Sequence, residues 1–345
     1  MLNLLYNIKK KPNMLAPLLP LIAFIVPLLW LYFLDSSSFE AMWKGRTFQL
    51  FFVWLIALEL ILGWENFKET KITKLLSTRT IAVAVAMILP TLYVAASFNF
   101  GLNNAIFNWS TVNNIKWASS MPLSTEYLAF TGLFCLVAFI ALGRKGLLNF
   151  SIPAVFMGIV GAIYTIDNVF PYGQFTPFQF FVQPTAYFAE RVLNFMGYQT
   201  SLSMGHDIFA GAMPTLSIAN QTGTATFAIA WPCAGIESLL IFTVVTLLFL
   251  KRMPISWKAK IGYFTFGAAV TYFINILRIV TIFTIGLQYG ETSSEVNWFH
   301  LYYGPLYSIS WIIIYPLLIF ASQSLWHKFR SKKPVEKIAG TLPIK

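Results

Sequence analysis

Three side chains able to do chemistry stand in otherwise apolar stretches of the chain: Cys233, Arg278 and His300. A thiol, a guanidinium and an imidazole together suffice for acyl transfer. The thiolate attacks a peptide carbonyl, the imidazole protonates the leaving amine, and the guanidinium stabilises the oxyanion or positions the substrate. The residue types therefore indicate a thiol-based acyl-transfer site, provided that the fold brings the three together.

Cys233 follows Pro232, which favours the first position of a helix. The sequence therefore predicts that the thiol lies in a first helical turn, where unpaired N–H groups and the helix dipole lower a thiol pKa. The nearby Gly235 would let an oxyanion approach the same N–H groups. A lone cysteine at a helix end is also a common small apolar filler, and Cys135, deep in a predicted span, fits that simpler interpretation.

The ionisable residues predicted inside spans are Glu59, Glu237 and Arg278, and such residues are functional candidates because the membrane makes them costly. Arg278 has Asn275 one helical turn away on the same face. A structural ion pair with Glu237 is the simpler alternative for Arg278. His300 is flanked by aromatic residues, so a place in an interfacial aromatic belt is its simpler alternative.

The composition excludes a soluble globular protein. The 345 residues are 57% hydrophobic and 11% charged, with a mean hydropathy of +0.67, whereas soluble domains carry roughly 25% charged residues. The net charge of +11 comes from basic residues in short loops between apolar runs, so we expect no nucleic-acid partner. Two cysteines cannot form a disulfide scaffold, and we expect no cleaved signal peptide.

Apolar runs of nearly 20 residues predict an all-α polytopic membrane protein with about eight transmembrane helices. We place them at about 15–34, 47–64, 80–98, 126–142, 147–166, 232–250, 261–287 and 302–325. The chain then forms a single integral membrane domain. Its parts are five N-terminal spans in 1–166, an outer-face segment at 167–231, three catalytic spans in 232–325 and a basic cytoplasmic tail at 326–345.

The basic residues also predict the orientation of the spans. With the N-terminus in the cytoplasm, 19 of the 24 lysines and arginines fall in inner segments, which predicts that both termini are cytoplasmic. Counted from the inner boundary, Cys233 and Arg278 each lie about 17 residues, or ~26 Å, up their helices, and tilt brings His300 near the same outer level. We therefore expect the site at the outer membrane face.

The outer-face segment carries two further patterns. Residues 184–196 open with Pro184 and place Phe188, Val192, Phe195 and Met196 at helical spacing, which predicts an amphipathic helix on the outer leaflet. Glycines then punctuate the chain, and alternating apolar residues at 226–231 predict a short strand or hairpin that leads into the sixth span.

The sequence resembles the exosortase/archaeosortase family at three places. These are the run from Cys233 to Ser238, the residues Asn275 and Arg278 in the next span, and His300 at the start of the last span. The resemblance covers roughly 178–325. It implies a membrane cysteine transpeptidase in which Cys233 is the nucleophile, Arg278 the charge stabiliser and His300 the acid/base, with the other motif residues in support. Those supporting residues are Gly235, Glu237, Ser238 and Asn275.

The resemblance also implies the partners. Substrates would be secreted proteins with a C-terminal motif, a transmembrane helix and a basic cluster, and a membrane lipid is the expected acceptor; no cofactor or metal is expected. Ala234 and Glu237 stand where bacterial members commonly have serine and arginine, which favours an archaeal type.

Two other classes of protein remain open. A transporter could use Arg278 and Glu237 to line a substrate path, although no repeat of spans is evident. A non-catalytic assembly protein could use the outer-face segment as a docking surface, in which case the common depth of the three polar residues would be chance.

Overall fold

The computed structural model describes residues 16–41, 43–67, 78–171, 174–207, 211–221 and 223–331. Within these residues, seven helical segments are long and apolar enough to cross a membrane, which confirms an all-α polytopic membrane fold. The predicted span that is not among these seven is the sixth, at 232–250, which corresponds to helix α9 (Ile236–Arg252). Its 17 residues extend about 26 Å, slightly less than the ~30 Å of a hydrocarbon core.

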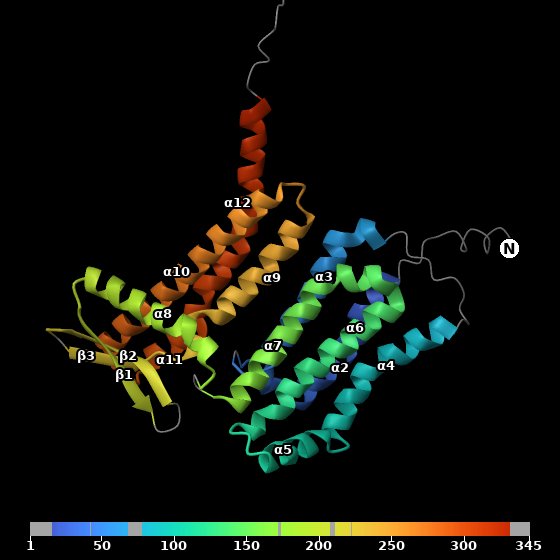
Figure 1. Cartoon of the computed structure of the whole chain (residues 1–345), viewed down its shortest axis with the longest axis horizontal. Coiled ribbons are helices and arrows are strands. Elements are labelled where there is room, and N and C mark those ends of the chain that lie inside the picture. The colour runs from blue at the N-terminus through green and yellow to red at the C-terminus, as the bar shows by residue number, and fades with distance from the viewer. Residues whose placement is uncertain are drawn as a thin grey trace, which may run out of the picture.

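The first five spans form one helical bundle, which we call the N-terminal bundle (Figure 1). Its core is aromatic: Phe24 contacts Phe52, Phe130 and Phe134 edge to face, with ring centroids 5.4–5.7 Å apart. Three short 3-10 helices, at Ala16–Leu18, Ser36–Phe39 and Ala118–Ser120, adjoin its spans. The helices are α2 (Leu19–Leu34), α3 (Thr47–Phe67), α4 (Thr78–Phe98), the short α5 (Leu102–Val112), α6 (Met121–Asn149) and α7 (Ser151–Val169).

Helices α9, α10 (Trp257–Tyr289) and α12 (Gly304–Ser331) form a second group of spans beside the N-terminal bundle (Figure 1). Phe242 of α9 packs fully buried against Tyr315 of α12, and Val244 and Leu248 of α9 join the core of the N-terminal bundle. Helix α9 therefore connects the two groups. Short turns precede two of these spans: η4 (Trp231–Ala234) before α9, and α11 (Ser294–Trp298) with η5 (Phe299–Tyr303) before α12.

The predicted amphipathic helix exists but begins earlier than expected. Helix α8 runs over Thr176–Phe195, with Pro177 in its first turn and Pro184 inside it, so Pro184 does not start the helix. Proline fits a first helical turn because its missing N–H has no partner there, and Pro177 takes that place. Phe188 and Phe195 are exposed, while the opposite face packs against the rest of the molecule. That buried face consists of Val182, Ala186, Ala189 and Leu193.

The extended segment is larger than predicted. Three antiparallel strands follow α8 in the order β1-β2-β3, over Gln199–Asp207, Gly211–Asn220 and Gly223–Ala228. Thr226 pairs with Ser217, and Leu216 and Ile218 of β2 are buried beneath the sheet. The expected strand at 226–231 is thus the end of β3, while Trp231 already belongs to η4. We call this end of the molecule the sheet end (Figure 1).

Buried ion pairs tie the spans together at both ends. At the sheet end Arg46 binds Glu126 through Nε and Nη2, at 2.7 and 2.9 Å, and Asp35 at 2.8 Å. Burial alone would lower the pKa of Arg46, but Glu126 and Asp35 reverse that effect and raise it.

At the opposite end Glu59 of α3, which is fully buried, pairs with both Lys251 and Arg252 of α9. Lys251 Nζ lies 3.0 Å from Glu59 Oε1 and donates to the carbonyl of Asn149 at 2.9 Å. Glu59 is therefore a structural residue that fixes α9 against α3. Of the predicted basic tail, 326–331 continue α12 and 332–345 lie outside the described residues, as do the basic residues at 9–11 and 68–74.

Candidate active site

The structure places Cys233 in the 3-10 turn η4, between the sheet and α9, and not in the first turn of an α-helix. Gly235, at φ +87°, separates η4 from α9, which begins at Ile236. The Cys233 N–H already donates to the carbonyl of Ala230 at 3.0 Å. Cys233 is therefore not placed where the α9 dipole was expected to lower the pKa of its thiol.

Asn275 of α10 fixes the other side of this turn, which we call the nucleophile turn (231–235). Its Nδ2 donates to the carbonyl of Cys233 at 3.0 Å, and its side chain lies directly against Gly235. A Cβ on Gly235 would meet Asn275 Cγ at 2.9 Å. Both the positive φ and this close approach explain why glycine occupies the position.

His300 reaches the nucleophile turn from the other side. It lies in the π-helical turn η5, a local widening that recurs at functional sites. The thiol sulfur of Cys233 and Nε2 of His300 are 3.9 Å apart, although 67 positions separate them in sequence. That distance is within reach of proton transfer once a substrate tightens the site.

Arg278 completes the group. Its Nη2 donates to the backbone carbonyl of His300 at 2.9 Å, so the guanidinium lies beside the imidazole. Gly304 makes room for it, since a Cβ there would meet Arg278 Nε at 2.7 Å. Arg278 Nε is buried and has no hydrogen-bond partner within the described part of the chain, so this N–H donor is not used by the described protein.

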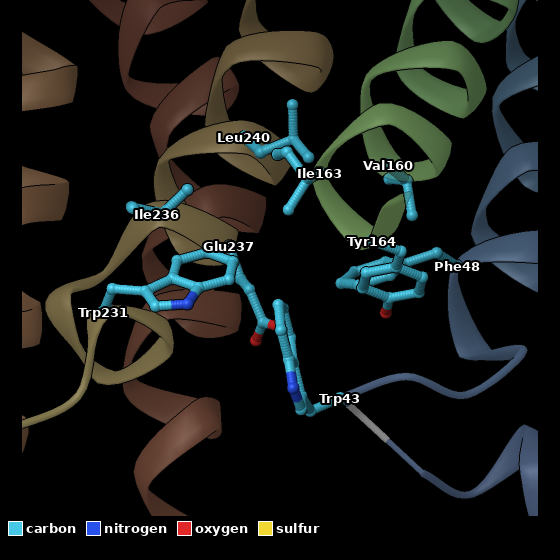
Figure 2. A pocket seen from close by; sticks show the side chains of 9 residues that line it. All are labelled: Trp43, Phe48, Val160, Ile163, Tyr164, Trp231, Ile236, Glu237 and Leu240. Atoms are coloured by element: carbon cyan, nitrogen blue, oxygen red, sulfur yellow. The ribbon is translucent and has the colours of Figure 1, made fainter. Parts of the chain in front are cut away.

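Glu237 does not form the ion pair that was the simpler explanation of Arg278. No ion pair within 4 Å joins these two side chains, both of which the structure describes. Glu237 instead lines a pocket between the N-terminal bundle and α9, where its carboxylate points between Trp231 and Trp43 (Figure 2). Arg278 is not part of that pocket, so the structure lends no support to a shared transport path.

The remaining supporting residue, Ser238, lies half-buried in the first turn of α9, and its side chain makes no hydrogen bond with any described residue. The structure thus brings Cys233, His300, Arg278 and Asn275 together with Gly235, and leaves Ser238 without a visible role.

Sequence reasoning missed several residues around the nucleophile turn. Trp231 donates its indole N–H to Asp167 of α7 at 2.8 Å, and Asp167 pairs with Lys44 at 2.8 Å. Thr185 of α8 lies 2.9 Å from the hydroxyl of Tyr272 and contacts the carbonyl of Ala234 at 3.5 Å. The sequence held one indication of the Lys44–Asp167 pair. Both residues are charged and lie on the predicted outer side, where few lysines and arginines fall because most of them lie in inner segments.

The fold and this arrangement define a class: a multi-pass helical membrane protein with a cysteine and a histidine converging at one end of its spans. Comparison with known families then assigns the chain, because residues 42–318 match the family described as transmembrane exosortase. The chain belongs to the transmembrane exosortase family, which implies a membrane transpeptidase in the processing of sorting signals. No curated protein and no solved structure matches it.

Proposed function

We propose that this exosortase is a cysteine transpeptidase that cleaves C-terminal sorting signals of secreted proteins at the outer membrane face and passes them to an acceptor, which we take to be a lipid. The observation that carries the proposal is the 3.9 Å approach of the Cys233 thiol to the imidazole of His300. The family match covers both residues. The basic bias of the loops supports a sheet end that faces outward and cytoplasmic termini.

The chemistry proceeds in two acyl transfers. His300 Nε2 takes the proton of Cys233, and the thiolate attacks the scissile carbonyl to form a tetrahedral intermediate. The guanidinium of Arg278, whose Nε has no partner among the described residues, stabilises its oxyanion. The His300 imidazolium then gives its proton to the leaving amine as the C–N bond breaks, which leaves a thioester on Cys233. Attack by the acceptor, with His300 again as base, releases the product and restores the thiol.

Two features refine the proposal. The substrate would carry its C-terminal motif next to a transmembrane helix and a basic cluster, because such a helix brings the motif to the membrane level of Cys233. Ala234 and Glu237, at positions where bacterial members commonly have serine and arginine, favour an archaeal type.

The test uses a secreted reporter that ends in a motif, a transmembrane helix and a basic cluster, followed by immunoblot in cells that make the full-length protein. Cys233→Ala should abolish shortening of the reporter while leaving membrane insertion near normal, because a small residue replaces a small one. Cys135→Ala is the matched control and should process at the normal rate, since Cys135 lies in α6 away from the nucleophile turn. Processing by Cys233→Ala at the normal rate would exclude the proposed nucleophile.

A further inference from the structure

The nucleophile turn is anchored to the N-terminal bundle as well as to α10. Trp231, two residues before Cys233 in the same turn, is only 2% exposed, and its indole N–H donates to Asp167 Oδ1 at 2.8 Å. Its ring stacks on Phe178 of α8 at 4.4 Å and meets Trp43 edge to face at 4.7 Å. One buried side chain of the turn is therefore held by three separate parts of the chain.

Asp167 is itself held in place. Its Oδ2 lies 2.8 Å from Lys44 Nζ, and the same ammonium donates to Asn168 Oδ1 at 2.7 Å and lies 3.3 Å above the ring of Trp117. Burial lowers the pKa of Lys44, and the hydrogen bond and charge of Asp167 partly offset that effect. Asp167 is 1% exposed. A fixed cation therefore holds one carboxylate oxygen, and the other is free to orient the indole.

We propose that Asp167 is a positioning residue, which fixes the nucleophile turn through the Trp231 indole and so sets the Cys233 thiol against His300. The role rests on the proposed function, and it assigns a task to the N-terminal bundle beyond membrane anchoring. The turn is held from both sides: Asn275 holds the Cys233 carbonyl from α10, and Asp167 holds Trp231 from α7. Because a misplacement of about 1 Å can cost about 10²-fold in rate, both attachments matter to a thiol and an imidazole 3.9 Å apart.

The test is a double-mutant cycle in the full-length protein, reconstituted in lipid nanodiscs and carrying Cys135→Ala so that one thiol remains. Trp231→Phe, Asp167→Ala and the double variant are compared for reporter processing. Each single change should lower the turnover rate about 10- to 100-fold with little change in KM, and the double variant should be no slower than the worse single one. Asp167→Asn keeps an oxygen acceptor for the indole and should recover most of the rate.

A second readout does not depend on the proposed function. The rate of Cys233 alkylation is measured at neutral and at alkaline pH. The rate at neutral pH divided by the rate at alkaline pH is called the alkylation ratio, and this division cancels differences in access to the thiol. Removal of the indole anchor should lower that ratio, because a displaced thiol loses its base, His300. If Cys233→Ala still processes the reporter, the proposed function fails, while the alkylation ratio still decides the role of Asp167.

Glu126→Gln is the matched control. It disrupts a buried ion pair at the same end, between Arg46 and Glu126, whereas the indole of Trp231 donates its hydrogen bond to Asp167. It should lower the thermal unfolding midpoint but leave the alkylation ratio and the turnover of folded protein near wild type. An unchanged ratio in Trp231→Phe, additive losses in the cycle, or an equal loss of turnover in Glu126→Gln would each overturn the positioning role.

Discussion

The guanidinium of Arg278 uses one of its nitrogens on the protein backbone and leaves another without a partner among the described residues. One nitrogen, Nη2, holds the backbone carbonyl of His300 at 2.9 Å, while the buried Nε has no partner within the described residues. Glu237 forms no ion pair with it, although both side chains are described. The fork of donors therefore fits recognition of an oxyanion better than charge balance.

Arg278→Lys separates these two interpretations. A lysine keeps the positive charge but lacks the planar fork, and loss of one oxyanion donor typically costs about 10² to 10³ in rate. We expect a loss of that size in reporter processing, with protein levels matched by immunoblot. Glu237→Gln, which alters the other supposed partner, should process much closer to the wild-type rate. Near-normal processing by Arg278→Lys would reduce Arg278 to a structural residue.

The common membrane depth of Cys233, Arg278 and His300 could be predicted from the sequence. Such a prediction needs only the rise per residue of a helix, counted from the basic residues at the inner end of each span. Their catalytic roles stay predictions. The bond from Trp231 to Asp167 could not be foreseen, since it joins residues 64 positions apart and depends on how α7 packs beside the nucleophile turn. Depth can be read along one helix, whereas lateral contact requires the packing of several.

Among the elements, the step from η4 to α9 is constrained in two ways. Gly235 combines a φ of +87° with close contact to the Asn275 side chain. Gly262 of α10 offers a comparison, because a Cβ there would meet nothing within 4 Å and its φ is not positive.

Gly235→Ala should therefore strain the turn and displace Asn275 from the Cys233 carbonyl. The left-handed backbone costs roughly 1–2 kcal/mol with a Cβ present, and the overlap with Asn275 adds about 1–3 kcal/mol. We expect a lower unfolding midpoint and slower processing. Gly262→Ala should be neutral or slightly stabilising, as expected for alanine inside a helix. Thermal unfolding of the two purified variants checks this, and equal midpoints would contradict the structural account.

The helices could be predicted from the sequence more fully than the strands. The spans were predictable because long apolar runs have few other interpretations. The sheet was mostly missed, since Leu202 and Met204 of β1 are exposed and the strand shows no inward alternation that would mark it. Helix α8 was misplaced at its start because two prolines, Pro177 and Pro184, could each begin a helix.

For the whole molecule, the orientation in the membrane is the prediction with the widest consequences. If the sheet end faces outward, a membrane-impermeant maleimide added to intact cells should label Cys233, which is partly accessible, and should not label Cys135 within α6. Labelling of each single-cysteine variant, before and after cell lysis, makes the measurement. A thiol at position 233 that reacts only after lysis would reverse the orientation and remove the proposed outer-face site.

Two sets of polar contacts join the part of the chain before α8 to the part after it, and they have a consequence for assembly. Glu59 holds Lys251 and Arg252 at one end of the spans, and Asp167 holds Trp231 at the other. Each attachment joins a residue before α8 to one after it, so neither depends on the peptide link between α7 and α8. Two polypeptides divided at that link and produced in the same cell should therefore recognise each other in the lipid and reconstitute the enzyme, in the manner of a split reporter.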